Sequence, residues 1–394
     1  MVYYISRKAK RINVLTFHEI FSGISTKSKY PCLRIMNLYF FLLRQLHSNK
    51  TKAMKKFNSY SLKIIAALML CCLGQNETAH CEPMPSWNKT PIKKSILDFV
   101  MVAKKQIPVK DRIAVFDMDG TIACEAPLWF EMYAAIDGLN RKSAKNPELL
   151  HYPEYKFAKK LEVNPADTSV INNWVNFSKA PYYNYIDSMV WKAYEGVDHE
   201  TYVHSARAYL TKTKDKKYNI ILADMFYQPM LELINYLKKN NFTVYIVSGS
   251  VQGVIWSVCP QTINLNRAHL IGTRQILSPI YKASDYQTLF VINKGIFPSK
   301  DDKDGKSINI YSQIGKKPVF AFGNTNGDFG MFHLASTNNY PNIELLLNHN
   351  DAIREYAYPP YHGEAVPGWR DSLSVNKWKL VNMAQEFRTV WKTK

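Results

Sequence analysis

Four short segments that occur in a fixed order constrain the fold of this 394-residue chain more than any other feature. The first, IAVFDMDGT at 113–121, is an apolar run that ends in two aspartates two positions apart. The other three carry a strand-end serine, a lysine, and a glycine turn with Asn and Asp: TVYIVSGS at 243–250, DGKSINI at 304–310 and PVFAFGNTNGD at 318–328. A single DxD pair is weak evidence, but the order and the apolar contexts of the whole set predict one site that handles phosphate.

Apolar segments with the length of strands alternate with helical patterns along the chain. A helix is predicted at 228–241, where a proline lies near the start and apolar residues recur at helical spacing. Apolar strands separated by helices are typical of a parallel α/β sheet, in which ligands bind beyond the carboxyl ends of the strands. The sequence therefore predicts that Asp117, Ser248 and Asp328 lie at one edge of the sheet. The predicted strands are 113–117, 243–247, 318–322 and 343–347.

The residues between the first two motifs differ in composition from the rest of the chain. They are rich in aromatic residues and have few strand patterns, which indicates a mostly helical insertion that covers the site as a cap. We predict that the cap comprises residues 122–225 and that residues 91–121 and 226–394 form the core.

The residue types at the motifs suit hydrolysis of a phosphate ester. A carboxylate is ionised at neutral pH and can form an aspartyl-phosphate that water later cleaves, which is the role predicted for Asp117. A second carboxylate, predicted to be Asp119, can donate a proton to the leaving alcohol and then accept one from water. Because two carboxylates repel a phosphoryl group, the site also needs positive charge, which Lys306 and a divalent cation would supply.

Hydroxyl and amide groups near the aspartates are predicted to hold the phosphoryl oxygens. Thr121, Ser248 and the backbone amides of the turn at Gly249 are the candidates. A hard cation that takes oxygen ligands and keeps several waters is Mg²⁺, which is therefore the predicted cofactor.

Together, DMDGT after a strand, SGS after a second, a later lysine and GNTNGD resemble the haloacid dehalogenase superfamily of phosphohydrolases. The position of the insertion resembles the phosphoserine-phosphatase-like branch, and the resemblance runs from about 93 to 390. It implies an α/β fold: a Rossmann-like core with a parallel sheet, and a mostly helical cap inserted after the first strand. The distal HNDAIREYAY (349–358) looks like a segment of bacterial members of this branch, with no chemistry assigned.

The resemblance also implies the ligands of the cation. These are Asp117, the main-chain carbonyl of Asp119, and Asp328, together with Asn324. Asn324 stands where many members carry an aspartate, so the negative charge of the site is lower by one.

Other interpretations remain open at this stage. Each motif taken alone is explained by a turn or a solvated lysine. Within the superfamily, a dehalogenase has no need of Asp119, because a halide leaves without a proton, and a phosphomutase would have to shield its aspartyl-phosphate from water. A non-catalytic protein that binds a phosphorylated ligand is the alternative from a different class; Asn324 favours it and the presence of Asp119 opposes it.

The substrate is predicted to be a small phosphorylated metabolite that the cap selects. Glu125 lies near the position where enzymes of this branch place a substrate-contacting glutamate, and a charge at the start of a helix is the simpler interpretation. Several aromatic residues would suit a cage for the quaternary amine of phosphocholine, although core packing explains them more simply. They are Tyr182, Tyr183, Tyr185, Trp191 and Tyr194.

The formal charge of +19 does not predict binding to nucleic acid. Residues 1–53 account for +9 and residues 54–90 for +2, which leaves +8 for the remainder. That remainder shows no basic stripe with interleaved aromatic residues. The oligomeric state is not indicated.

The N-terminal part reads as a leader. From Met54 a basic start, an apolar stretch at 62–73 and a polar tail follow in the order of a secretory signal peptide, so 54–81 is predicted to be one. Residues 1–53 are then a non-native or untranslated extension. We expect an exported protein, periplasmic or attached to the envelope, with membrane contact only through a lipid on Cys71 or Cys72. A buried N-terminal helix is the alternative.

Three cysteines would remain after such a leader: Cys81, Cys124 and Cys259. Their wide spacing excludes a disulfide framework and a cysteine metal site. At most one disulfide forms among them, and core packing explains them equally well.

Overall fold

The computed structural model describes residues 82–165, 182–284, 286–296, 300–356, 373 and 377–392, with only the backbone of 182–187 and 296. The predicted extension (1–53) and leader (54–81) lie outside the described residues. In the part of the chain that is described, no helix is both long and apolar enough to cross a membrane.

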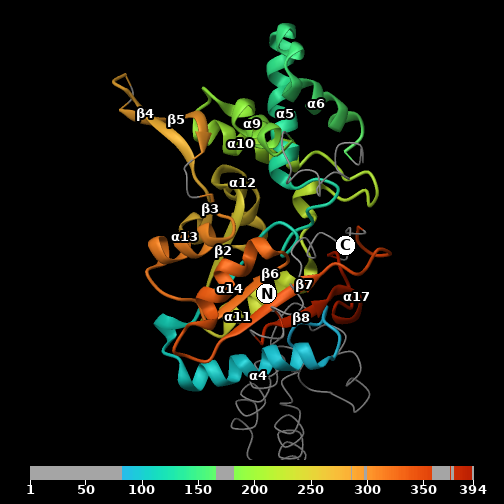
Figure 1. The fold of residues 1–394 in the computed structure, drawn as a ribbon, viewed down its shortest axis with the longest axis vertical. Helices are drawn as coiled ribbons and strands as arrows, with labels where there is room; N and C mark the ends of the chain where they lie inside the picture. Colours follow the sequence, from blue (N-terminus) through green and yellow to red (C-terminus); the bar gives the residue numbers. More distant parts are fainter. Residues whose placement is uncertain are drawn as a thin grey trace, which may run out of the picture. The chain divides into compact units, whose positions relative to one another are not determined.

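A six-stranded parallel sheet lies within the compact unit Glu82–Lys394 (Figure 1). Its strand order is β3-β2-β1-β6-β7-β8, so the first strand is central and later strands are added on both sides. The strands are β1 Ile113–Phe116, β2 Thr243–Val251, β3 Leu270–Thr273, β6 Phe320–Gly323, β7 Ile343–Asn348 and β8 Lys379–Asn382. All five pairings are parallel, which confirms the predicted α/β fold class.

Alternate residues of the sheet pack into two cores, one on each face. Ala114 and Phe116 of β1 belong to a core that includes residues of α4 Pro91–Gln106, α11 Gln228–Lys239 and α12 Gln252–Ile263. Ile113 and Val115 belong to the opposite core, with α13 Asp304–Ile314 and α14 Phe329–Ser336. Because both faces are covered, β1 is buried at every position, as its uninterrupted apolar sequence indicates.

Short helical turns complete this part of the fold. They are the 3-10 turns η2 Val109–Asp111, η4 Leu222–Asp224, η5 Arg267–His269 and η6 Asn326–Asp328, and the four-residue helix α17 Met383–Glu386.

The four predicted strands and the predicted helix at 228–241 are present, with ends that differ by a few residues. The largest difference is at β2, which continues through the SGS segment to Val251 instead of ending before it. The strands β3 and β8 were not predicted. Each has four residues, and most of the β8 side chains are only partly buried, so neither gives a clear apolar pattern.

Between β1 and α11 in the sequence, the described residues include four longer helices, with a 3-10 turn between the first two. They are α5 Phe130–Lys145, η3 Pro147–His151, α6 Pro153–Val163, α9 Tyr182–Tyr194 and α10 His199–Leu210. An antiparallel hairpin, β4 Gln275–Lys282 and β5 Gln287–Ile296, lies against α9 and α10 (Figure 1). This hairpin falls in the range that the sequence assigned to the core (226–394), yet β5 contacts α9 and α10 of the insertion.

Trp87, which precedes α4, contacts both α11 and the C-terminal part of the chain. The indole N–H of Trp87 donates to the carbonyl of Pro229 at 2.8 Å. The Trp87 ring also meets Phe387 edge-on, with 5.0 Å between centroids. Both rings are almost fully buried.

We predict that Trp87→Ala lowers the free energy of unfolding by about 3–5 kcal/mol, because it leaves a cavity beside Phe387. Trp87→Phe should cost about 1–2 kcal/mol, since an aromatic ring remains and mainly the hydrogen bond is lost. Urea denaturation of the two variants and the wild type measures both values. Equal losses in the two variants would contradict the packing role of the ring.

Candidate active site

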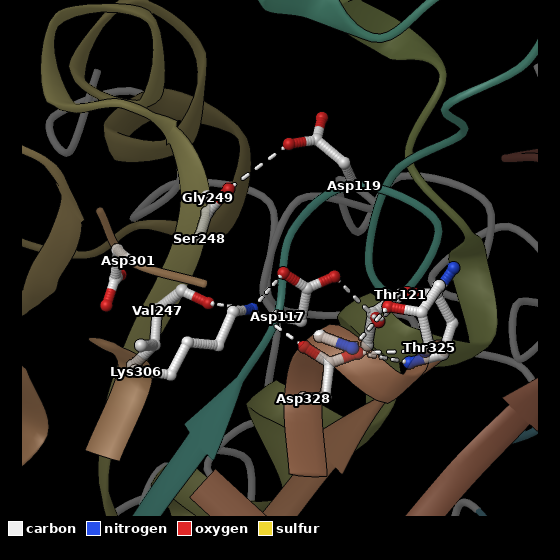
Figure 2. Close-up of polar contacts among 12 residues, drawn as sticks. Asp117, Asp119, Thr121, Val247, Ser248, Gly249, Asp301, Lys306, Thr325 and Asp328 are labelled. Atoms are coloured by element: carbon white, nitrogen blue, oxygen red, sulfur yellow. Dashed lines mark hydrogen bonds and ion pairs between the residues drawn. The ribbon is translucent and has the colours of Figure 1, made fainter. Parts of the chain in front are cut away.

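The ammonium group of Lys306 contacts a residue within β2 and the aspartates that follow β1 and β6 (Figure 2). Its Nζ lies 2.5 Å from Oδ1 of Asp117, which follows β1, and 2.7 Å from Oδ1 of Asp328, which follows β6. It also donates to the carbonyl of Val247 in β2 at 2.8 Å. The three charged side chains are at most 8% exposed, so the ion pairs are shielded from water.

Burial and neighbouring charges shift the pKa values of Lys306 and Asp117. Burial lowers the pKa of Lys306, but the carboxylates of Asp117, Asp328 and Asp301 outweigh burial and raise it, so the ammonium stays charged. Burial raises the pKa of Asp117; Lys306 opposes this shift, and Asp328 and Asp119 add to it. Further positive charge at the site would therefore favour the ionised form of Asp117.

The carboxylate of Asp119 points toward β2 and away from Asp117 (Figure 2). Its Oδ2 accepts hydrogen bonds from the hydroxyls of Ser248 at 3.1 Å and Ser250 at 2.7 Å. Its Oδ1 is buried without a hydrogen-bond partner. The sequence assigned Ser248 to the phosphoryl group, but here it holds Asp119, and Ser250 was missed although it lies in the same motif.

Burial raises the pKa of Asp119 to about 7, against the lowering effect of the Ser250 hydrogen bond. The carboxylates of Glu125 and Glu131 also raise it. A carboxyl group that titrates near neutral pH is suited to both donating and accepting a proton.

A chain of hydrogen bonds links Thr121, Asn324 and Glu125. The Thr121 hydroxyl lies 3.0 Å from Oδ2 of Asp117 and 3.2 Å from Oδ1 of Asn324. The other half of the Asn324 amide, Nδ2, donates to Oε1 of Glu125 at 2.8 Å. Because a carboxylate can only accept, Glu125 fixes which way the amide faces.

Gly120 allows these groups to come together. Its φ of +74° is a conformation that side chains disfavour. A Cβ at this position would lie 2.0 Å from Nδ2 of Asn324 and 2.2 Å from Oε1 of Glu125. Glycine is therefore required both by the backbone and by the close approach of the Asn324–Glu125 pair.

Asp328 shapes the turn that follows β6. Its Oδ2 accepts from the backbone amides of Asn324 at 2.8 Å and Thr325 at 2.9 Å, while Oδ1 binds Lys306. The Thr325 side chain accepts in return from the amide of Gly327, which completes a capping box. The GNTNGD segment is therefore a structured turn whose aspartate also pairs with the lysine.

The insertion also reaches the site. Oε1 of Glu131, in α5, accepts from the backbone amide of Val251 at 2.7 Å. Gly249 lies between the two serines that bind Asp119, and its carbonyl accepts from Thr273 at 2.7 Å. The sequence gave no signal for Glu131, because nothing in its surroundings distinguishes it from other acidic residues at the start of a helix.

The donor chemistry of the predicted Mg²⁺ ligands fits a hard cation. Oδ2 of Asp117 and Oδ1 of Asn324 face the same Thr121 hydroxyl, so two oxygen ligands converge there. Even when Asp119 is protonated, the two carboxylates of Asp117 and Asp328 exceed the one ammonium of Lys306 in charge. Among the described residues, no group of three or more His, Cys, Asp or Glu side chains is arranged to hold a metal.

The aromatic residues considered for an amine cage have different surroundings. Tyr194 is buried, donates to the carbonyl of Ala134 at 2.7 Å and packs against Tyr202, so it is a core residue. The Trp191 ring has the ammonium groups of Lys192 and Lys294 at 5.5 and 5.3 Å. The side chains of Tyr182, Tyr183 and Tyr185 lie outside the described residues.

The cysteines that can be examined are structural. Cys124 and Cys259 are buried and form no disulfide, as core packing predicts, and Cys81 lies outside the described residues.

Comparison with known protein families finds a match over part of the chain. A family model described as haloacid dehalogenase-like hydrolase matches residues 112–281. No curated protein matches the chain significantly in sequence. Over residues 112–281, the chain is similar to haloacid dehalogenase-like hydrolases.

Solved structures show more distant likenesses. A protein of unknown function from Anaerococcus prevotii DSM 20548 is 13% identical, with a TM-score of 0.43, over 72% of this chain and 88% of its own. A cytosolic 5'-nucleotidase IIIB bound to cytidine is 13% identical, with a TM-score of 0.37, over 66% of this chain and 80% of its own. A phosphoserine phosphohydrolase-like protein from Francisella tularensis subsp. tularensis SCHU S4 is 12% identical, with a TM-score of 0.36, over 70% of this chain and 97% of its own. Likenesses this distant carry no argument about activity.

We predict that Asn324→Asp lowers the free energy of unfolding by about 1–3 kcal/mol, because two carboxylates would replace the Asn324–Glu125 hydrogen bond. Glu125→Gln combined with Asn324→Asp should restore most of this loss, since glutamine can donate to the new carboxylate. Urea denaturation in EDTA, with Glu125→Gln alone as the control, separates this effect from cation binding. An Asn324→Asp variant as stable as the wild type would contradict the prediction.

Proposed function

We propose that this protein is a Mg²⁺-dependent phosphatase that hydrolyses small phosphate monoesters through an aspartyl-phosphate on Asp117. The observation that carries the proposal is the Lys306 ammonium, which lies within 2.7 Å of both Asp117 and Asp328 at the carboxyl ends of β1 and β6. A nucleophilic carboxylate with a fixed cation beside it suits attack on a negatively charged phosphoryl group.

The reaction can be followed through the chain's own residues. The Asp117 carboxylate attacks phosphorus and the ester P–O bond breaks, while Asp119 gives its proton to the leaving alcohol oxygen. The ionised Asp119 then takes a proton from water as that water attacks the aspartyl-phosphate. Inorganic phosphate leaves, and Asp117 is regenerated with Asp119 again protonated. Lys306 supports the first step by balancing negative charge beside Asp117.

Asp117, Asn324, Asp328 and the main-chain carbonyl of Asp119 would hold the cation. When bound, Mg²⁺ would supply further positive charge against the phosphoryl oxygens. The excess of carboxylates over ammonium at this site supports the presence of a cation.

The substrate is proposed as a small phosphorylated metabolite. Phosphocholine belongs in a substrate screen, although the buried Tyr194 is not available to a cage. The alternative of a non-catalytic binding protein is opposed by Asp119, whose carboxyl is held by two serines and has a pKa of about 7.

We predict that the purified full-length chain hydrolyses p-nitrophenyl phosphate only with Mg²⁺. Asp117→Asn should lower kcat by at least about 10³-fold, because an amide cannot form the covalent intermediate. The matched control is Asp111→Asn, which removes an exposed ion pair with Lys316 and should leave turnover unchanged. Turnover by the wild type and the two variants is measured as release of p-nitrophenol, with EDTA added in the metal-free assay.

Two results would oppose the proposal. Turnover by the Asp117→Asn variant at the wild-type rate would exclude Asp117 as the nucleophile. A folded wild-type protein without turnover on this ester and on a panel of natural phosphate esters would favour the binding protein.

We also propose that the protein is exported, because the basic, apolar and polar segments from Met54 follow in leader order. When the full sequence is expressed in a Gram-negative bacterium, the mature protein is expected in the envelope or periplasm, with an N-terminus after the apolar run at 62–73. Cell fractionation and N-terminal sequencing check this. A cytoplasmic protein that retains this run would contradict it.

A further inference from the structure

A histidine that the reaction scheme does not use contacts the catalytic loop, residues 117–121. His349 follows β7 directly, and its Nε2 lies 2.6 Å from the carbonyl oxygen of Gly120. Because a carbonyl can only accept, the Nε2 atom carries a proton and donates it. The bonded groups are 229 positions apart in the sequence, so this contact fixes the loop to a different strand end.

The other ring nitrogen of His349 faces a fully buried glutamate. Nδ1 lies 3.2 Å from Oε2 of Glu355, whose side chain is 0% exposed. Oε1 of Glu355 accepts from the hydroxyl of Tyr227 at 2.9 Å and lies 3.2 Å from Sγ of Cys124. Because Nε2 donates to Gly120, the contact between Nδ1 and Glu355 is a hydrogen bond when a proton lies between these two atoms. With that proton, both oxygens of Glu355 are held, and Glu355 orients the His349 ring toward the loop.

The segment that carries these residues is itself firmly anchored. The Arg354 guanidinium donates to Asp351 and to the carbonyl of Phe387, and the Trp391 indole donates to the carbonyl of Arg354. The backbone carbonyl of Glu355 accepts from Lys217. A group held from this many directions can act as a rigid support for another element.

Gly120 is the residue at which such support has the largest effect. It lies between Asp119 and Thr121, and its amide already donates to the carbonyl of Ala123 at 2.8 Å. With the carbonyl held as well, neither peptide of this positive-φ residue is free to rotate. Rotation there would turn the Asp119 and Thr121 side chains relative to Asp117.

We propose that His349 is a positioning residue, which, oriented by Glu355, holds the Gly120 carbonyl so that Asp119 and Thr121 keep their places beside Asp117. The simpler alternative is a buried histidine that only contributes to folding. The kinetic part of the proposal rests on the proposed phosphatase function. The structural part does not, since it concerns the mobility of the loop.

Two polar variants of similar character separate the alternatives. His349→Gln places an amide N–H at the reach of Nε2 and can still donate to Gly120, whereas His349→Asn reaches only as far as Nδ1 and cannot. Tyr356→Phe is the matched control, because it removes a hydrogen bond of the same segment, to Asp215 at 2.6 Å, without touching the loop.

The full-length proteins are compared by Mg²⁺-supported kinetics, urea denaturation, and hydrogen exchange of the peptide covering 117–124. We expect His349→Asn to lower kcat by about 10–100-fold with KM changed less than about threefold, because displaced catalytic groups cost rate more than binding. Exchange in the loop should rise at least about tenfold, as its local opening becomes easier. His349→Gln should recover most of both effects, and Tyr356→Phe should lose stability only.

Several outcomes would overturn the proposal. One is a loss of kcat in Tyr356→Phe equal to that in His349→Asn, and another is loop exchange that stays at the wild-type rate in His349→Asn. Equal kinetics in the Gln and Asn variants would also exclude the donor role. If the wild type shows no turnover, the phosphatase proposal fails by itself, and hydrogen exchange still decides whether His349 holds the loop.

Discussion

The fold around the site depends on one buried ammonium group. Lys306 comes from α13, and its partners follow or lie in β1, β2 and β6, so a single side chain fixes a helix to three strands. Without its charge, the carboxylates of Asp117 and Asp328 would remain buried and uncompensated, a state that costs several kcal/mol in proteins. The positions of the helix and of the strand ends are therefore mutually dependent.

The parts of the site that the sequence predicts are those that backbone geometry determines. The residues after β1 and β6 must lie at one edge because parallel strands place their carboxyl ends together, and the apolar runs show where those strands are. Gly120 is predictable for a similar reason, since the turn needs a positive φ. Lys306 was found through its motif, and no periodicity would have placed it between two aspartates.

The remaining contacts depend on side chains that meet only after folding. Ser250 is two positions from Ser248 and still gave no sign that both would bind Asp119. His349 and Gly120 share no spacing that a sequence pattern could reveal. The β4–β5 hairpin lies in the range assigned to the core, but β5 packs against α9 and α10 of the insertion. Local strand patterns do not encode which helices a hairpin packs against.

Asn324 illustrates how such contacts change the meaning of a substitution. As a sequence feature, an amide in place of an aspartate removes a negative charge from the cation site and favours a non-catalytic protein. In the structure both halves of the amide are used, since Thr121 bonds its oxygen and Glu125 its nitrogen. An aspartate at 324 would face the carboxylate of Glu125. Glu125, which accepts a hydrogen bond from Asn324, thus supplies the negative charge that position 324 lacks. Asn324 is therefore a matched partner of Glu125, and it no longer argues against catalysis.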